Sequence, residues 1–531
     1  MHNKSNTWII VIVLTFLVTL ATNATYLTYV LHTPKSTINL GVTHYWEDYM
    51  YYVSQFSQGA HGNWLNHSLF TEETIAPTLL HFPNILLGKI GGLFHLSPMD
   101  SYQISCIILL CLFLLLSFYC MKKLFKKSTY ALPAFLFFTF SASLMNRLPE
   151  TAPEPFYPFQ LWNTPHYMFD RFTQLPHYFV MNMCFLVVLL FLFGKAKNTW
   201  FAIGTGVCML SMTILQPIVA TLTLGTAILT ASIQKEHSLW KNIGIISIGY
   251  FVGIAALIRL YMTNSYVQTM TSEAGWQVLT TLPFLLKSIG PILPFAIVGI
   301  IAKLKKAAAI ERFGMILLVG SYTTFLIPEI PRFLKFSNAR LLFSAQYLFW
   351  GWFAAIGLFT LAQYIGRCVV VKKQIIISVL FFLFFSSVTP TIIWEIQHRL
   401  PDTAIYQNEL YFLPKTTASA FTYLDKQVPY QDIVLANSDS HMNMLVPVLS
   451  GHKTMLGPAY ATINASMKGK EIHAFFTLTM DEETARQWVR AHHISYILYT
   501  VTDGYAGSFA QHYPFLEKVF SSDTATVYKV K

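Results

Sequence analysis

The sequence predicts a mostly α-helical polytopic membrane protein that ends in a C-terminal extracytoplasmic α/β domain. Of its 531 residues, 54% are hydrophobic and only 11% are charged, whereas soluble domains carry roughly a quarter charged residues. Apolar segments long enough to cross about 30 Å of hydrocarbon recur as far as residue 394. Residues 395–531 lack such segments and instead alternate strand-like and helix-like patterns.

Eleven apolar segments are predicted to be transmembrane helices. They lie near residues 8–31, 100–121, 129–146, 177–194, 199–214, 216–233, 243–262, 282–302, 313–330, 340–366 and 374–394. The first is too long for the hydrophobic part of a signal peptide, so we expect an uncleaved anchor. The pair at 199–233 is broken at Gln216-Pro217 and fits two short helices or one kinked helix. Residues 76–96 are broken by Pro83 and three glycines, which favours a helix lying at the interface.

The distribution of charge predicts the orientation. The loops 122–127, 195–197, 235–241, 303–312 and 367–373 are all basic, as expected for the cytoplasmic side. Of the acids before residue 395, only Glu236 and Glu311 fall in these loops. An odd number of spans then places residues 395–531 outside, and we expect an integral protein of the bacterial plasma membrane. The net charge of +11 follows from this orientation and from membrane lipids, so no nucleic-acid partner is predicted.

The chain is therefore divided into two predicted domains. Residues 1–394 form the transmembrane domain, with outer loops at 32–99 and 147–176. Residues 395–531 form the α/β domain. Its strand-like runs at 432–436, 453–456, 494–499 and 525–530 alternate with helix candidates near 441–449, 466–478 and 482–492. This alternation predicts a small, largely parallel sheet.

The most informative polar feature is a pair of adjacent acids, Glu47 and Asp48, shortly after the first span. Charge is costly beside a bilayer, and carboxylates suit proton transfer. In a helix, Tyr51 and Gln55 would share a polar face with Glu47, while Tyr52 would belong to an aromatic face. A sugar ring needs both kinds of surface. The alternative interpretation is an interfacial aromatic belt with exposed acids.

The sequence gives weaker evidence for a metal site and for disulfide bonds. His44 would lie one helical turn before Asp48, and one histidine with one or two carboxylates could hold a divalent ion. No histidine spacing resembles a metal site, so neither a metal nor another cofactor is predicted. All six cysteines fall in or beside proposed spans, and no disulfide framework is implied.

Two further outer segments could bind substrate. Residues 147–176 contain Glu150, Glu154 and, between residues 149 and 165, five prolines, which predicts an ordered, irregular loop that either holds a substrate or caps the bundle. Residues 329–340 place Arg332, Lys335 and Arg340 outside, against the positive-inside trend. A lipid phosphate would account for these cations. Snorkelling toward headgroups is the alternative.

Together these features resemble the GT-C-type glycosyltransferases. The shared features are an anchor span, an outer loop with paired acids, a proline-containing interfacial helix, about ten further spans and an outer tail. The closer resemblance is to bacterial polyprenyl-phosphate-sugar-dependent transferases, which are related to protein O-mannosyltransferases and lipid A aminoarabinose transferases. It covers residues 1 to about 394. In that family a carboxylate of the first outer loop is catalytic, and the match falls on Glu47 and Asp48. Many relatives have Asp before Glu, and this chain has the reverse order.

The resemblance implies inverting transfer of a sugar from a polyprenyl-phosphate donor to an extracytoplasmic lipid, glycan or protein acceptor. We expect Asp48 to be the base, with Glu47 orienting it or binding the acceptor, and Arg340, Lys335 or Arg332 to neutralise the phosphate. One alternative is a non-catalytic transporter or scaffold with a degenerate GT-C fold. The scarcity of ionisable residues within the spans counts against ion-coupled transport. Another alternative is a lipid-linked glycan polymerase or ligase.

Overall fold

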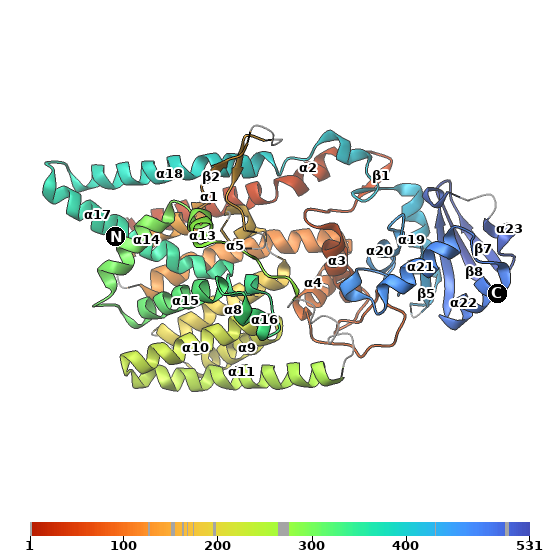
Figure 1. The fold of residues 1–531 in the computed structure, drawn as a ribbon, viewed down its shortest axis with the longest axis horizontal. Coiled ribbons are helices and arrows are strands. Elements are labelled where there is room, and N and C mark those ends of the chain that lie inside the picture. The colour runs from red at the N-terminus through yellow and green to blue at the C-terminus, as the bar shows by residue number, and fades with distance from the viewer. Residues whose placement is uncertain are drawn as a thin grey trace. The chain divides into compact units, whose positions relative to one another are not determined.

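The computed structural model describes residues 3–125, 128–149, 154–161, 164–166, 168–173, 175–194, 198–263, 275–430, 432–504 and 509–531. The chain divides into two compact units. The helical unit comprises Met1–Ala24, Cys106–Arg259 and Thr271–Leu400. The mixed unit comprises Thr25–Ser105, Leu260–Met270 and Pro401–Lys531. Figure 1 labels the elements of both units.

Each of the eleven predicted spans contains a helix. These are α1 (Asn3–Thr22) with α2 (Ala24–His32), α5 (Pro98–Leu124), α6 (Ala131–Phe140), α8 (Pro176–Phe193), α9 (Thr199–Leu215), α10 (Pro217–Gln234), α11 (His237–Thr263), α13 (Leu282–Ile289) with α14 (Ile292–Lys303), α15 (Ala309–Phe325), α17 (Tyr347–Cys368) and α18 (Lys373–Gln397). Within the described residues, six helices are long and apolar enough to cross a membrane, or up to eight if each bent pair forms one span. The count of eleven stays a prediction.

Local sequence accounts for the breaks in these helices. Pro217 starts α10 as a helix separate from α9, because proline lacks the N–H group that a continuous helix would need. The segment 282–302 is bent by 95° between α13 and α14. Gly290 lies at this bend with a φ of 80°, a conformation that favours glycine.

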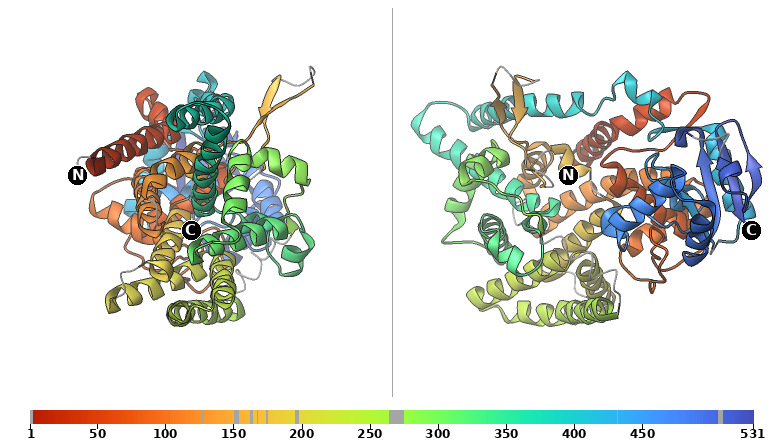
Figure 2. Two further views of the ribbon diagram at one scale, coloured as in Figure 1. Left: turned by 90° about the vertical axis from the view of Figure 1, so that its left-hand side faces the viewer. Right: turned by 45° about the vertical axis from the view of Figure 1, so that its right-hand side comes forward.

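The core of the helical unit is centred on α17, whose residues from Tyr347 to Leu358 are all buried. Glycines let α14 and α17 approach closely. A Cβ on Gly299 would lie 1.9 Å from the carbonyl oxygen of Phe353, and one on Gly357 would lie 1.8 Å from that of Phe295. Small residues at such crossings allow backbones to pack together. The hairpin of β2 (Met145–Arg147) and β3 (Phe156–Pro158) projects from this unit (Figure 2).

The mixed unit joins the first outer loop to the tail. Strand β1 (Thr37–Asn39) pairs antiparallel with β4 (Phe412–Pro414). Helix α3 (Trp46–Ala60) packs on α4 (Phe82–Leu93) and on α20 (Met442–Leu449) of the tail. Gly59 permits the α3–α4 contact, since a Cβ there would lie 2.1 Å from the carbonyl oxygen of Ile85. Helix α4 lies within residues 76–96, where the sequence predicts a helix. Its location at the membrane interface stays a prediction.

The tail contains one four-stranded sheet with the order β5-β6-β8-β7. Its strands are β5 (Ile433–Ala436), β6 (Ile494–Thr500), β7 (Leu516–Ser521) and β8 (Ala525–Val530), and its helices are α19 (Lys415–Gln427), α20, α21 (Ala465–Phe476), α22 (Glu482–Ala491) and α23 (Phe509–His512). Only β5 and β6 run parallel. The prediction of a largely parallel sheet was wrong, because β7 and β8 form an antiparallel hairpin. The run 453–456 forms no strand of this sheet and contributes two isolated bridges, from Lys453 to Ile433 and from Leu456 to Thr71.

Candidate active site

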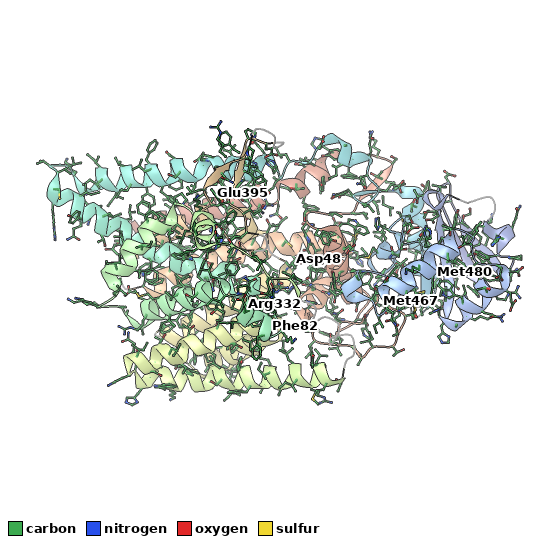
Figure 3. The ribbon with its side chains drawn as sticks, viewed as in Figure 1. Asp48, Phe82, Arg332, Glu395, Met467 and Met480 are labelled. Atoms are coloured by element: carbon green, nitrogen blue, oxygen red, sulfur yellow. The ribbon has the colours of Figure 1, made fainter. Side chains whose placement is uncertain are left out.

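Glu47 and Asp48 lie in the first turn of α3, where unpaired N–H groups and the helix dipole favour negative charge. Both side chains are half-buried. The Asp48 Oδ1 atom accepts a hydrogen bond of 2.6 Å from the Tyr460 hydroxyl. Figure 3 labels Asp48 on this helix. The predicted catalytic acid therefore has a partner from the tail of the same unit.

Tyr460 belongs to the short 3-10 helix η6 (Ala459–Ala461). Its ring meets that of Tyr51 edge-on, with centroids 5.5 Å apart. Burial, followed by the nearby Tyr52 and Asp48, raises the pKa of Tyr460 far above its usual value. The phenol therefore keeps its proton and acts as a donor toward the carboxylate.

His44 does not share a helical face with Asp48, as the sequence suggested. Helix α3 begins at Trp46, so His44 precedes it. Its Nε2 atom lies 2.9 Å from the Tyr102 hydroxyl, and its ring packs edge-on against Tyr49. Burial lowers the pKa of His44 to about 4, so the imidazole is neutral at pH 7. Among the residues described, no group of three or more metal-ligating side chains is brought together.

Three residues predicted to bind substrate lie farther along α3. Tyr51 is buried, whereas Tyr52 is half-buried with its ring edge-on to His81 at 5.5 Å. Gln55 is fully buried. It accepts a 2.7 Å hydrogen bond from Asn84, and its Nε2 atom lies 3.3 Å from His81 Nδ1. Gln55 thus joins α3 to α4. At this position α4 covers the polar face that the sequence predicts for α3.

The predicted phosphate-binding cations lie in the helical unit. Arg332, on α16 (Glu329–Phe333), and Lys335 are exposed (Figure 3 labels Arg332). Arg340 is half-buried in the 3-10 helix η3 (Asn338–Leu341). Its guanidinium donates to the Tyr178 hydroxyl and lies 5.8 Å from the centre of the Trp276 ring. Arg340 is therefore held more firmly than the other two cations.

Asn338 fixes the backbone on which Arg340 sits. Its Nδ2 donates to the carbonyl oxygens of Val278 and Phe325, both at 2.9 Å. Its Oδ1 accepts from the Val278 N–H at 2.8 Å. Gln277 adds a bond from its Nε2 to the carbonyl oxygen of Phe336 at 2.9 Å. These bonds attach residues 276–278 to η3, so Trp276 and Arg340 are positioned by one network.

The sequence predicted two substrate-binding acids, Glu150 and Glu154, in the second outer loop. Glu150 lies outside the described residues. Glu154 pairs with His398 at 2.8 Å and accepts from the indole N–H of Trp394 at 2.8 Å. The hydrogen bonds from His398 and Trp394 lower the pKa of Glu154. Glu154 is therefore held by the end of α18.

The sequence did not predict the roles of two residues, Tyr460 and Arg171. Tyr460 lies in no recognisable motif, and only tertiary contact reveals it. Arg171 is completely buried and donates to the carbonyl oxygen of Phe138 at 3.0 Å and to Ser141 Oγ at 2.7 Å. Helix α6 ends at Phe140, before the end of the predicted span 129–146. The Arg171 cation lies at this C-terminus, where positive charge offsets the helix dipole. Its position in the proline-rich loop was the only available signal.

No protein-family model matches the sequence, and no curated protein matches it. Among solved structures, the oligosaccharyltransferase AglB from Archaeoglobus fulgidus, in complex with an inhibitory peptide and a dolichol-phosphate, matches with a TM-score of 0.52 and 10% identity over 97% of this chain and 72% of that chain. The arabinofuranosyltransferase AftD from Mycobacteria matches with a TM-score of 0.50 and 12% identity over 97% of this chain and 40% of that one. ArnT from Cupriavidus metallidurans, bound to undecaprenyl phosphate, gives 0.49 and 12% over 98% and 97%.

The first two of these matches extend over almost the whole of this chain, and both matched proteins are glycosyltransferases. The low identities restrict the likeness to the fold. The protein therefore shares the overall fold of these two glycosyltransferases, in agreement with the resemblance of its sequence to GT-C-type transferases.

Proposed function

We propose that this protein is an integral-membrane glycosyltransferase that moves a sugar from a polyprenyl-phosphate donor to an acceptor outside the cytoplasm. The fold likeness to AglB carries the proposal. The dolichol-phosphate in that AglB structure supports a lipid-linked donor. The basic inner loops support an extracytoplasmic site and tail. The acceptor is a lipid, a glycan or a protein.

The proposed chemistry is one displacement at the anomeric carbon. The acceptor oxygen attacks this carbon, and Asp48 takes its proton. The bond between the anomeric carbon and the phosphate oxygen breaks, and its electron pair leaves with the polyprenyl phosphate. A single displacement inverts the anomeric centre. Glu47 is the adjacent residue of α3, about 100° around the helix, and orients Asp48 or binds the acceptor.

The leaving phosphate needs a positive partner. A guanidinium forms charge-assisted, often paired hydrogen bonds to phosphate, and fixed donors stabilise charge that develops in the transition state. Arg340 suits this role because Tyr178, Trp276 and the Asn338 network hold it. Arg332 and Lys335 are exposed and supply a more general attraction for the anionic donor.

Purified Asp48→Asn and Glu47→Gln variants test this proposal. The substrate is radiolabelled sugar linked to undecaprenyl phosphate, with a bacterial membrane fraction as the source of acceptor. We expect Asp48→Asn to lower turnover by about 10²–10⁴-fold, as removal of a general base does. Asp439→Asn is the matched control, since Asp439 is an exposed acid of the same unit paired with His473.

The outcomes separate the hypotheses. Loss of activity in Glu47→Gln but not in Asp48→Asn would reverse the assignment of the base. Wild-type turnover in both variants would contradict the catalytic role of this loop and favour a transporter or scaffold.

A further inference from the structure

Tyr460 reaches the proposed base from the tail, 412 residues later in the chain. We propose that Tyr460 is a positioning residue, whose hydroxyl orients the Asp48 carboxylate and sets its basicity. The tail is then part of the catalytic apparatus rather than a separate accessory domain. This inference rests on the proposed function, because it concerns the base of the same reaction.

The loop that carries Tyr460 is locked to the first outer loop. Thr462 Oγ1 donates to the carbonyl oxygen of Phe70 at 2.7 Å and accepts from the Gly457 N–H at 2.9 Å. The Ile463 N–H donates to Thr71 Oγ1 at 3.3 Å. A Cβ on Gly457 would lie 2.3 Å from the Phe70 ring, so only glycine allows this approach. The position of Tyr460 is therefore fixed relative to the loop that contains Asp48.

Ring packing directs the hydroxyl. The Tyr460 ring contacts the buried Tyr51, which in turn lies 6.0 Å from the Phe70 ring, measured between centroids. Other titratable groups lie on α3 and on the elements packed against it. They are Tyr45, Glu47 and Tyr52 beside or on α3, His81 before α4, and His441 before α20. The geometry places the Tyr460 hydroxyl at the first turn of α3, where Asp48 is found.

A hydrogen bond donated to a carboxylate favours its charged form and so lowers its pKa. Because Tyr460 keeps its proton at working pH, this bond persists while Asp48 is ionised. The bond also restricts rotation of the carboxylate, and small errors in the position of a reacting group reduce rate steeply. Loss of the hydroxyl should therefore affect both the pH profile and turnover.

The Tyr460→Phe variant removes the hydroxyl and keeps the ring. Release of undecaprenyl phosphate from a radiolabelled undecaprenyl-phosphate sugar is followed from acidic to neutral pH. We expect the acidic limb of kcat/KM to move up by about one pH unit, and kcat to fall by roughly ten- to a hundredfold. The KM for the lipid donor and the melting temperature should stay close to wild type.

Tyr430→Phe is the matched control. Tyr430 is another tail tyrosine whose hydroxyl bonds to the first outer loop, accepting from Asn63 at 2.9 Å. Its removal should leave the pH limb in place. A change common to both tyrosine variants, accompanied by lowered melting temperature, would mean that Tyr460 acts only through folding, and the inference would be wrong.

Two outcomes distinguish the inference from the proposed function. An unshifted limb and wild-type kcat in Tyr460→Phe, together with an inactive Asp48→Asn, would overturn the inference and leave the proposed function standing. Wild-type turnover in Asp48→Asn and Glu47→Gln would remove the proposed function itself. Complete inactivity of a folded Tyr460→Phe at every pH would also contradict a positioning role.

Discussion

Replacement of Lys468 by methionine tests how the first outer loop is held to the tail. Lys468 is a residue of α21 and is only 1% exposed. Its Nζ lies 2.8 Å from both carboxylate oxygens of Glu73, 3.1 Å from Thr71 Oγ1 and 3.4 Å from Glu72. Methionine keeps most of the volume and removes the charge, so the two acids lose their buried cation.

The magnitude follows from burial. Removing one partner of a fully buried ion pair costs about 3–5 kcal/mol. Here Glu73 is 33% exposed, and Glu72 also pairs with His492 at 2.7 Å. Water and His492 therefore compensate in part, and we expect a loss of about 2–3 kcal/mol. The substitution should destabilise the mixed unit locally, because these bonds connect α21 to residues 71–73.

Hydrogen exchange of the detergent-solubilised protein measures this loss. Amides of residues 69–73 and of α21 should exchange faster, by about tenfold for each 1.4 kcal/mol lost. Lys470→Met is the control, since Lys470 is exposed on the same helix. The double variant Lys468→Met, Glu73→Gln should recover part of the protection, because the unpaired charge is removed as well.

The same bridge predicts a dependence on acid. Burial raises the pKa of Glu73, but the hydrogen bonds from Lys468 and Thr71 outweigh it, and the pKa is lowered from 4.5. Its contribution to stability is therefore complete above pH 4.5 and is lost as the pH falls through the lowered value. This acid sensitivity should weaken in Lys468→Met. Equal protection of Lys468→Met and Lys470→Met would refute the reasoning.

Two further predictions concern topology and the phosphate. Met467→Cys, at a half-exposed position of the tail, should react with an impermeant thiol reagent in spheroplasts, whereas the exposed native Cys368 should react only after lysis. The opposite pattern would contradict the predicted orientation, and labelling of both only after lysis would contradict the odd number of spans. Arg340→Ala should weaken binding of undecaprenyl phosphate by about 1.5–3 kcal/mol, whereas Lys287→Ala, which removes an exposed cation beside Phe159, should change it little. Equal affinities, measured by titration in detergent, would exclude Arg340 from the site.

Local features of the sequence determined the positions of the helices. Each apolar segment that is long enough to be predicted as a span contains a helix in the structure. The length of an apolar segment is informative because the cost of burying polar groups in lipid acts on each segment separately. Pro217 likewise separated α9 from α10 through its missing N–H group. The order of these segments and the acids of the first outer loop gave the resemblance to GT-C-type transferases, which implied the fold.

Tertiary contacts decided the rest. The start of α3 at Trp46 separated His44 from Asp48, and the packing of α4 covered Gln55. The pairing of β1 with β4 and the bond from Tyr460 to Asp48 join residues hundreds of positions apart. No local pattern encodes such contacts, because each depends on how two distant surfaces fit together. The sequence therefore determined which acids to consider, whereas only the folded chain decided which side chains surround them.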